Sequence, residues 1–255
     1  MDQLTDIGHI SHFSRGLLEL LDRVEYRRIT SEEDLHEVGR LRAKSYSNRS
    51  IFASDVGQKL IEDLDFDGHA YVFGMYIEEE LVSTLRVHHV TPEHRVGNSV
   101  PLFGDLIHPM LDAGMSFIDP SRFATDARHF HEFPGIPYLT LRIATMASIH
   151  FDVDSCLASC KVEHASFYRR VFGFKQLGEA RVLSGYRRPA VLCMEDASNR
   201  ADVARRYPVF KSHPYEQRLM FSDDASDGPA PLSILPTARF ADAASGRDIA
   251  RLFAS

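Results

Sequence analysis

The fold is decided by the stretch His164-Ala165-Ser166-Phe167-Tyr168-Arg169-Arg170-Val171-Phe172-Gly173-Phe174. Its apolar spacing predicts a helix over residues 164–172, which a Gly-Phe pair follows. A short strand is expected before it at residues 156–160, and a closing pair of strands after it at residues 182–186 and 190–194. The stretch is therefore the last helix of a region in which helices alternate with strands.

The chain before this stretch also mixes the two kinds of element. An amphipathic helix is predicted within residues 9–25, and its apolar face either packs on the main domain or meets a lipid surface. An antiparallel hairpin is predicted around Glu78-Glu79-Glu80, because β-rich runs flank these residues on both sides. The other expected elements are a strand at 26–29, a helix through 35–41, a strand at 115–123, a long loop at 127–137 and a helix at 139–149.

Length and composition describe an ordinary globular protein. The 255 residues are 44% hydrophobic and 25% charged, which excludes collagen-like, disulfide-scaffold and fully disordered chains. No apolar run is long enough to span a membrane, and the start does not resemble a signal peptide, so a cytoplasmic protein is expected. The three cysteines fit a reducing compartment and are expected as buried small hydrophobes, with no metal argued from them.

Charge is distributed unevenly along the chain. Residues 161–211 hold eleven basic and five acidic residues, a balance of +6, while the whole chain carries −7. The negative total argues against a nucleic-acid partner. The basic segment is either a solvated face or a docking surface for an acidic partner or a phosphate.

Common catalytic motifs are missing. The chain contains no P-loop, no Gly-x-Gly-x-x-Gly after a strand and no nucleophile elbow. The thirteen histidines lack the helical spacing of a zinc protease, so no metal site is expected.

The 164–174 stretch resembles the final helix of the Gcn5-related N-acetyltransferase superfamily. The resemblance implies a mixed α/β fold with a central, mainly antiparallel sheet and helices on both faces. It also implies that Tyr168 protonates the thiolate that leaves during acyl transfer, although Tyr168 is separated from Gly173 by one residue more than is usual. A core tyrosine with a satisfied hydroxyl is the alternative.

A second departure concerns the acyl donor. In the superfamily a glycine-rich loop holds the pyrophosphate of coenzyme A at a helix N-terminus, and residues 128–137 lack that pattern. We therefore expect no tightly bound cofactor and a donor that presents only acyl-phosphopantetheine, namely an acyl-carrier protein. Its acidic surface would dock on Arg169, Arg170 and Lys175 in the basic segment.

Further motifs narrow the resemblance to acyl-homoserine-lactone synthases and the related long-chain N-acyl amino acid synthases. It covers roughly residues 26–195. The motifs are Arg42-Ala-Lys-Ser-Tyr46, Leu85-Arg86, the acidic segment Asp65-Phe66-Asp67 and Asp119-Pro-Ser-Arg122-Phe123. The chain has no Trp, which the lactone synthases carry after the first helix, and this departure favours the amino acid synthases.

The resemblance assigns roles to particular side chains. An arginine can form paired bonds to a carboxylate, but an internal Arg–Asp network that only orders the fold is the alternative. On a regular strand Asp119 and Arg122 would face opposite sides, and a bulge would alter this. The expected catalytic residues are Asp119, Arg122 and Tyr168, the substrate-binding residues Arg42, Asp67, Arg86 and Phe123, and the acyl-pocket residues Phe117, Leu139, Ile143 and Met146.

The function expected from these features is transfer of a long-chain fatty acyl group from an acyl-carrier protein to the amine of an amino acid. A lactone synthase that uses S-adenosylmethionine and a non-catalytic acyl or carrier-protein binding module remain as alternatives. The accepted amino acid, the chain length and the oligomeric state are left open. We expect an N-terminal amphipathic helix (1–25), an acyltransferase domain (26–212) and a loosely docked or mobile C-terminal tail (213–255), with peripheral membrane contact as an open alternative.

Overall fold

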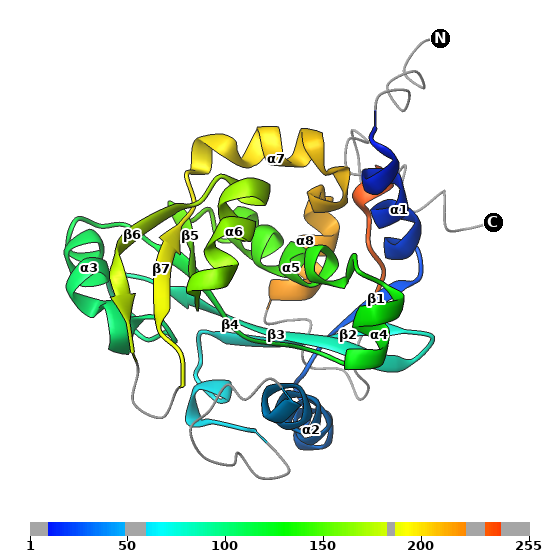
Figure 1. The fold of residues 1–255 in the computed structure, drawn as a ribbon, viewed down its shortest axis with the longest axis horizontal. Helices are drawn as coiled ribbons and strands as arrows, with labels where there is room; N and C mark the ends of the chain where they lie inside the picture. Colours follow the sequence, from blue (N-terminus) through cyan, green and yellow to red (C-terminus); the bar gives the residue numbers. More distant parts are fainter. Residues whose placement is uncertain (1–9, 49–59, 183–186, 223–232, 241–255) are drawn as a thin grey trace.

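The computed structural model describes residues 10–48, 60–182, 187–222 and 233–240. They form an eight-stranded sheet in the order β6-β7-β5-β4-β3-β2-β1-β8 (Figure 1). Neighbouring strands are antiparallel except for the central β4–β5 pair, which is parallel. The strands are β1 (Val24–Arg28), β2 (Ala70–Ile77), β3 (Glu80–Val90), β4 (Phe117–Thr125), β5 (Ser155–Lys161), β6 (Lys175–Arg181), β7 (Ala190–Met194) and β8 (Ser233–Ile234).

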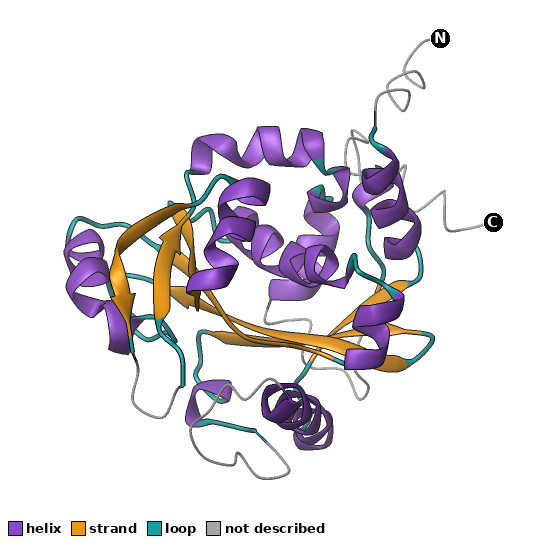
Figure 2. Cartoon of the chain, viewed as in Figure 1, coloured by secondary structure: helices purple, strands orange, loops and turns teal. Residues whose placement is uncertain are grey.

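Helices cover both faces of the sheet (Figure 2), which confirms the predicted mixed α/β architecture. One face carries α2 and α3, and the other carries α1, α5, α6 and α8. The helices are α1 (His12–Leu21), α2 (Glu32–Asn48), α3 (Val100–Asp112), α4 (Ala127–Glu132), α5 (Ile136–His150), α6 (Ala165–Phe172), α7 (Arg200–Arg206) and α8 (Pro214–Phe221). No described helix combines the length and the apolar content that crossing a membrane requires.

The N-terminal helix α1 packs on the main domain. Ser11 caps it by accepting a hydrogen bond from the backbone N–H of Ser14. Its apolar stripe, which includes Leu17, Leu18 and Leu21, is buried in the main core. Of the two fates that the sequence left open for this stripe, the structure shows packing.

The C-terminal segment differs from the expectation of a loosely docked tail. Its described parts, residues 213–222 and 233–240, enter both the core and the sheet. Met220 and Phe221 of α8 are buried beside α5, and β8 pairs with β1 at the sheet edge. The apolar residues of this segment are too scattered to predict a packed helix. α8 is nevertheless buried, because polar residues such as Glu216 also form part of its buried face.

Four other α-helices and strands were not expected from the sequence. Helix α3 follows the hairpin, α4 lies in the stretch predicted as a loop, α7 follows the predicted strand β7, and β6 is the strand that pairs with β7. The strand predicted at residues 182–186 lies outside the described residues except for Val182. The sequence did not predict β6, because β6 is an edge strand whose side chains are mostly exposed and which therefore lacks an alternating apolar pattern.

The predicted hairpin is formed by β2 and β3 with a two-residue turn. Ile77 pairs with Glu80, and the intervening Glu78 and Glu79 both have positive φ angles of 52° and 65°. Two-residue hairpins favour this turn geometry because it matches the twist of the strands, but Asn-Gly suits it better than two glutamates. The turn therefore stores backbone strain at an exposed position.

Replacing Glu78 with Asn and Glu79 with Gly should raise the free energy of unfolding by about 1 kcal/mol, because both new residues accept positive φ. Urea denaturation measures the change. The matched control carries Glu78→Gln and Glu79→Gln, which remove the same two charges and leave the strain. Equal stability of the two double variants would contradict the strain argument.

Candidate active site

A cavity opens where the two parallel strands separate. β4 and β5 pair only through Phe117 with Ser155 and Ile118 with Cys156, and they diverge beyond these pairs. The space between them measures ≈ 440 Å³ including its open mouth. It is lined by Pro120 of β4, Leu141, Ala144, Thr145 and Ser148 of α5, Cys156, Leu157, Ala158 and Ser159 of β5, Tyr168 and Phe172 of α6, and by Phe174 and Glu195.

β4 has a bulge next to this cavity. Thr84 of β3 faces Ala124, but Arg86 already faces Ser121, so two residues of β4 stand against one of β3. Arg122 lies in the bulge with a positive φ of 51°. A bulge releases backbone N–H groups from the ladder, and such groups can polarise the carbonyl of a thioester.

Tyr168 stands at the wall of the cavity. It comes from α6, which ends at Gly173 in the left-handed conformation with φ 73°. Burial raises the pKa of the Tyr168 hydroxyl, and the nearby thiol of Cys160 adds to the effect. The phenol therefore stays protonated at neutral pH and can donate a proton or a hydrogen bond into the cavity.

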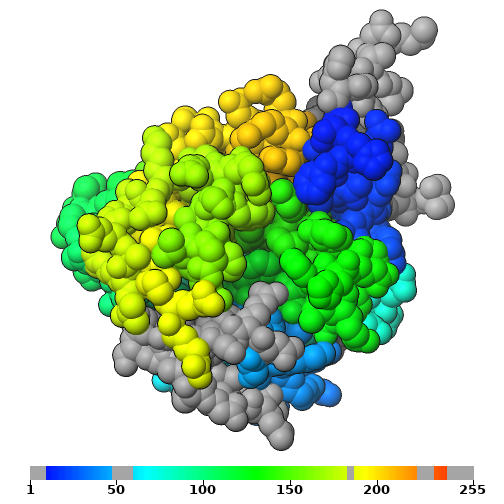
Figure 3. All heavy atoms as spheres, viewed as in Figure 1, coloured from blue at the N-terminus to red at the C-terminus, as the bar shows by residue number. Residues whose placement is uncertain are grey.

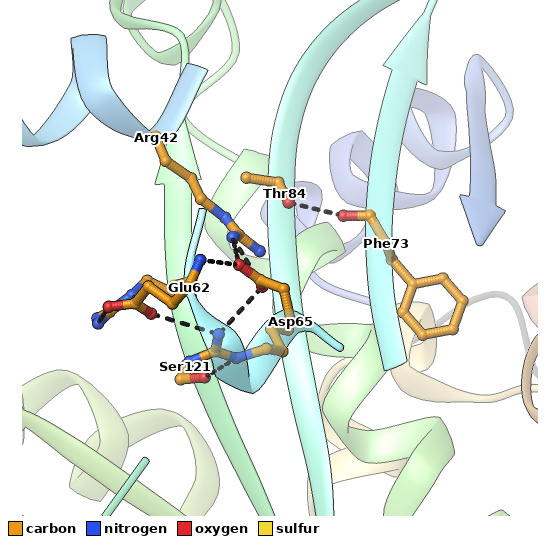
Figure 4. A network of polar contacts seen from close by, with 8 residues as sticks. Arg42, Glu62, Asp65, Phe73, Thr84 and Ser121 are labelled. Atoms are coloured by element: carbon orange, nitrogen blue, oxygen red, sulfur yellow. Dashed lines mark hydrogen bonds and ion pairs between the residues drawn. The ribbon is translucent and has the colours of Figure 1, made fainter. Parts of the chain in front are cut away.

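Three arginines converge near the bulge, on the face of the sheet that α2 covers, and Figure 4 labels Arg42 among them. Arg42 of α2 binds Asp65 through Nη1, at 2.9 Å from both carboxylate oxygens. Arg86 of β3 donates to Asp65 at 3.0 Å, to Glu62 at 3.3 Å and to the Ser121 hydroxyl at 3.1 Å. Arg122 donates two hydrogen bonds to Glu62. The bulge thus turns Arg122 toward the same network as Ser121.

This arginine network carries an excess of positive charge. Three guanidinium groups face two carboxylates, from Glu62 and from Asp65 at the end of the short 3-10 helix Asp63–Asp65. Burial alone would raise the pKa of Asp65, but the charges of Arg42 and Arg86 outweigh it and the pKa is lowered, so the carboxylate is ionised. Nε and Nη2 of Arg42 and Nη2 of Arg86 find no hydrogen-bond acceptor among the described residues. The network therefore keeps unused donors.

A family model described as the N-acyl amino acid synthase FeeM matches residues 37–196, which include the arginine network, the bulge and Tyr168. The chain belongs to the FeeM family. It is thus an acyltransferase that acylates an amine.

Solved structures share the fold. FeeM from uncultured soil microbes is 15% identical with a TM-score of 0.57, and the match covers 71% of this chain and 94% of that chain. BjaI, a CoA-dependent acyl-homoserine lactone synthase solved with SAM and isopentyl-CoA, is 12% identical with a TM-score of 0.50, covering 72% and 89%. An acyl-CoA N-acyltransferase from Pseudomonas aeruginosa is 13% identical with a TM-score of 0.44, covering 68% and 99%. A search among curated proteins gives no match.

Two acidic residues that the sequence motifs singled out, Asp119 and Asp67, are not among the residues that line the cavity. Both carboxylate oxygens of the buried Asp119 accept hydrogen bonds from Ser99, from its N–H at 2.7 Å and from its hydroxyl at 2.6 Å. Burial raises the pKa of Asp119, and these bonds oppose the increase. Asp67 pairs instead with His94, whose Nε2 lies 2.9 Å from Oδ1.

Glu62 was missed by the sequence analysis, which took Asp65 and Asp67 as the acidic segment. The carboxylates that meet the arginines are those of Glu62 and Asp65, three residues apart. Glu62 is the N-cap of the 3-10 helix, and its N–H donates to the Asp65 carboxylate at 2.9 Å, so two acidic residues at the N-cap and three positions later were the available signal.

The four side chains expected to line the acyl pocket do not reach the cavity. Leu139, Ile143 and Met146 lie in the main core, and Phe117 lies in the smaller core under α3. The neighbouring stripe of α5 lines the cavity instead, because the helix turns two different faces toward the core and toward β5. Phe123 packs against the main core, and its backbone oxygen accepts a hydrogen bond from the Tyr46 hydroxyl at 3.1 Å.

The expected docking residues lie at the surface. Arg169 and Arg170 are exposed on α6, next to Tyr168. Lys175 begins β6, and its ammonium group lies 3.0 Å from a carboxylate oxygen of Asp196. The charge of Lys175 is thus partly offset within the protein.

Proposed function

We propose that this protein transfers a long-chain acyl group from the phosphopantetheine thioester of an acyl-carrier protein to the amine of an amino acid. One observation carries the proposal. A single cavity has the protonated phenol of Tyr168 on one side and the β4 bulge on the other, and Arg122 in that bulge belongs to the positively charged arginine network. The cavity suits the acyl thioester, and the network suits the carboxylate of an amino acid.

The chemistry follows from these positions. The amine first loses its ammonium proton to solvent and then attacks the thioester carbonyl, and the attacking nitrogen gives a second proton to solvent before the amide forms. Bulge N–H groups stabilise the oxyanion that forms. Collapse of this intermediate forms the amide and breaks the C–S bond, and Tyr168 gives its proton to the departing sulfur. The phenol then recovers a proton from solvent.

The acceptor site is proposed at the arginine network. A carboxylate binds favourably where positive charge exceeds negative charge and guanidinium donors are unused. Arg42 and Arg86 supply such donors, and Arg122 in the bulge is the closest of the three arginines in sequence to the cavity-lining Pro120. Asp119 contributes by fixing Ser99 rather than by taking the amine proton, because it is fully buried and does not line the cavity.

The donor is proposed to be a carrier protein because the stretch 126–138 offers little to a pyrophosphate. The Asp126 carboxylate caps α4 by accepting from the N–H of Arg128 at 2.9 Å, so this N–H is not free to bind phosphate. At the start of α5, the N–H of Ile136 donates to Phe133, residue 137 is a proline, and the N–H of Tyr138 donates to Gly135. Anion binding at a helix N-terminus depends on free N–H groups.

The test is a reconstituted reaction of purified protein with hexadecanoyl carrier protein and a mixture of the common amino acids, analysed by mass spectrometry. N-hexadecanoyl amino acids are the expected products, and a parallel reaction with S-adenosylmethionine as the acceptor should give no lactone. Formation of a lactone would show that the protein is a lactone synthase instead. Binding of the carrier protein without any product would indicate a non-catalytic binding module.

A long chain should need the small residues on the cavity face of α5. Ala144→Leu fills part of the cavity, so kcat/KM for a hexadecanoyl donor should fall by about 10-fold or more while an octanoyl donor is used nearly as before. Competition between the two donors, read by mass spectrometry, measures the shift. Ile149→Leu, on the same helix at an exposed position, is the matched control. An unchanged product ratio in Ala144→Leu would place the acyl chain elsewhere.

A further inference from the structure

Helix α1 lies outside the residues that match the family model, yet a chain of aromatic contacts connects it to the wall of the cavity. The Phe13 ring of α1 meets Tyr138 of α5 edge-on at 5.1 Å, Tyr138 meets Phe167 at 5.5 Å, and Phe167 meets Tyr168 at 5.5 Å. We call these four residues the aromatic strip. It runs from the surface, where Phe13 is 46% exposed, to the wall of the cavity.

The same helix covers the beginning of α5. A Cβ atom added at Gly135 would lie 2.7 Å from Leu17 Cδ2 and 3.3 Å from Leu20 Cδ2, so the two leucines press directly on the backbone there. This backbone is where free N–H groups would hold a phosphate, and α1 closes it with aliphatic carbon. A coenzyme A pyrophosphate thus meets neither donors nor space at this position.

A positive charge flanks the strip. Arg170 of α6 is exposed, and it lies close enough to Tyr138 for its charge to oppose the increase in pKa that burial causes there. Arg169 is exposed beside it. On the face shown in Figure 3, α1 in blue, the green segment that contains α5 and the yellow-green α6 lie side by side. An exposed aromatic ring beside arginines suits a partner whose contact surface is acidic with apolar side chains.

We propose that α1 selects the acyl donor: it closes the start of α5 to coenzyme A and presents Phe13, which contacts Tyr138 near Arg170, to an acidic acyl-carrier protein. This inference rests on the proposed function. It assigns to a helix outside the family match a role in choosing between two donors that carry the same thioester.

Three donors with the same acyl group test the proposal: acyl-carrier protein, acyl-coenzyme A and acyl-pantetheine, which lacks phosphate and nucleotide. In the unmodified protein, the values of kcat/KM for acyl-coenzyme A and for acyl-pantetheine should agree within about 3-fold. The kcat/KM for the acyl-carrier protein should exceed both values by about 10-fold or more. A preference of coenzyme A over pantetheine by about 10-fold would overturn the closed-site argument.

Phe13→Ser should lower kcat/KM for the carrier by about 10-fold and leave acyl-pantetheine unchanged, because a single interface aromatic typically carries this much binding energy. An equal loss with both donors would indicate a structural role and overturn the proposal, as would an unchanged rate with the carrier. Tyr215→Ser, at an aromatic residue of α8 that is 49% exposed and lies outside the strip, is the matched control.

Binding of the holo-carrier, followed by fluorescence anisotropy, separates this inference from the proposed function. Absence of product from every donor would reject the proposed function. In that case a weaker carrier affinity of Phe13→Ser still supports the role of α1, and an affinity that does not depend on Phe13 overturns it.

Discussion

Replacement of Glu216 by alanine is expected to lower the free energy of unfolding by about 3–5 kcal/mol. Glu216 of α8 and Arg142 of α5 are both fully buried and form a paired salt bridge, with Nη2 of Arg142 at 2.8 Å from Oε2. The N–H and the hydroxyl of Thr237 also donate to Glu216, at 3.0 and 2.6 Å. Removing the carboxylate leaves a buried guanidinium without its counter-charge. This cost is a large share of the stability of a typical domain.

Urea denaturation of the Glu216→Ala variant measures this effect. Glu179→Ala, an exposed glutamate of β6, is the control and should change stability by less than about 0.5 kcal/mol. The double variant Arg142→Leu with Glu216→Leu should recover most of the loss, because an apolar pair of similar volume needs no charge compensation. A change of less than about 1 kcal/mol in Glu216→Ala would mean that water reaches the pair and that α8 is only loosely attached.

Replacement of Tyr168 by phenylalanine is expected to reduce kcat by about 100-fold with an alkyl thioester donor, in line with the loss of a general acid. The variant keeps the ring, which touches Phe167, Phe172 and Phe174, so the fold should not change. Single-turnover assays with acyl-pantetheine measure the chemical step. Tyr207→Phe, in the aromatic cluster away from the cavity, is the matched control.

The leaving group distinguishes proton donation from positioning. An aryl thioester leaves as a stable thiolate and needs little help, so the gap between Tyr168→Phe and the unmodified protein should narrow to about 10-fold or less. A gap of the same size with both donors would show that the hydroxyl only positions the substrate. Full activity of Tyr168→Phe with the alkyl donor would remove Tyr168 from the mechanism.

Sequence reasoning succeeded where chemistry and local pattern agree. The hairpin, the strand before α6 and α6 itself follow from local sequence pattern. The structure places Arg42, Arg86 and Arg122 in one network, and their role in binding substrate stays a prediction. The mixed α/β fold with its mainly antiparallel sheet is confirmed.

The remaining features depend on tertiary structure that one sequence does not display. Both stripes of α5 are apolar or small, so the sequence alone could not tell the core face with Ile143 from the cavity face with Ala144. Glu62 and Asp67 are both acidic residues near Asp65, and only the backbone turn decides which one meets Arg86. The partner of Arg142 is Glu216, 74 residues away, which no local pattern reveals.

The pairing of β8 with β1 has a consequence for how the chain acquires its structure. Ser233 donates a hydrogen bond to Glu25 across a sequence separation of 208 residues, and Thr237 completes the shell around Glu216 and Arg142. During synthesis, β1 and α5 emerge long before these partners exist, so the nascent chain carries an open sheet edge and an uncompensated interior charge. Final consolidation is therefore a late event, and until then the open edge of β1 is a site where other chains can pair.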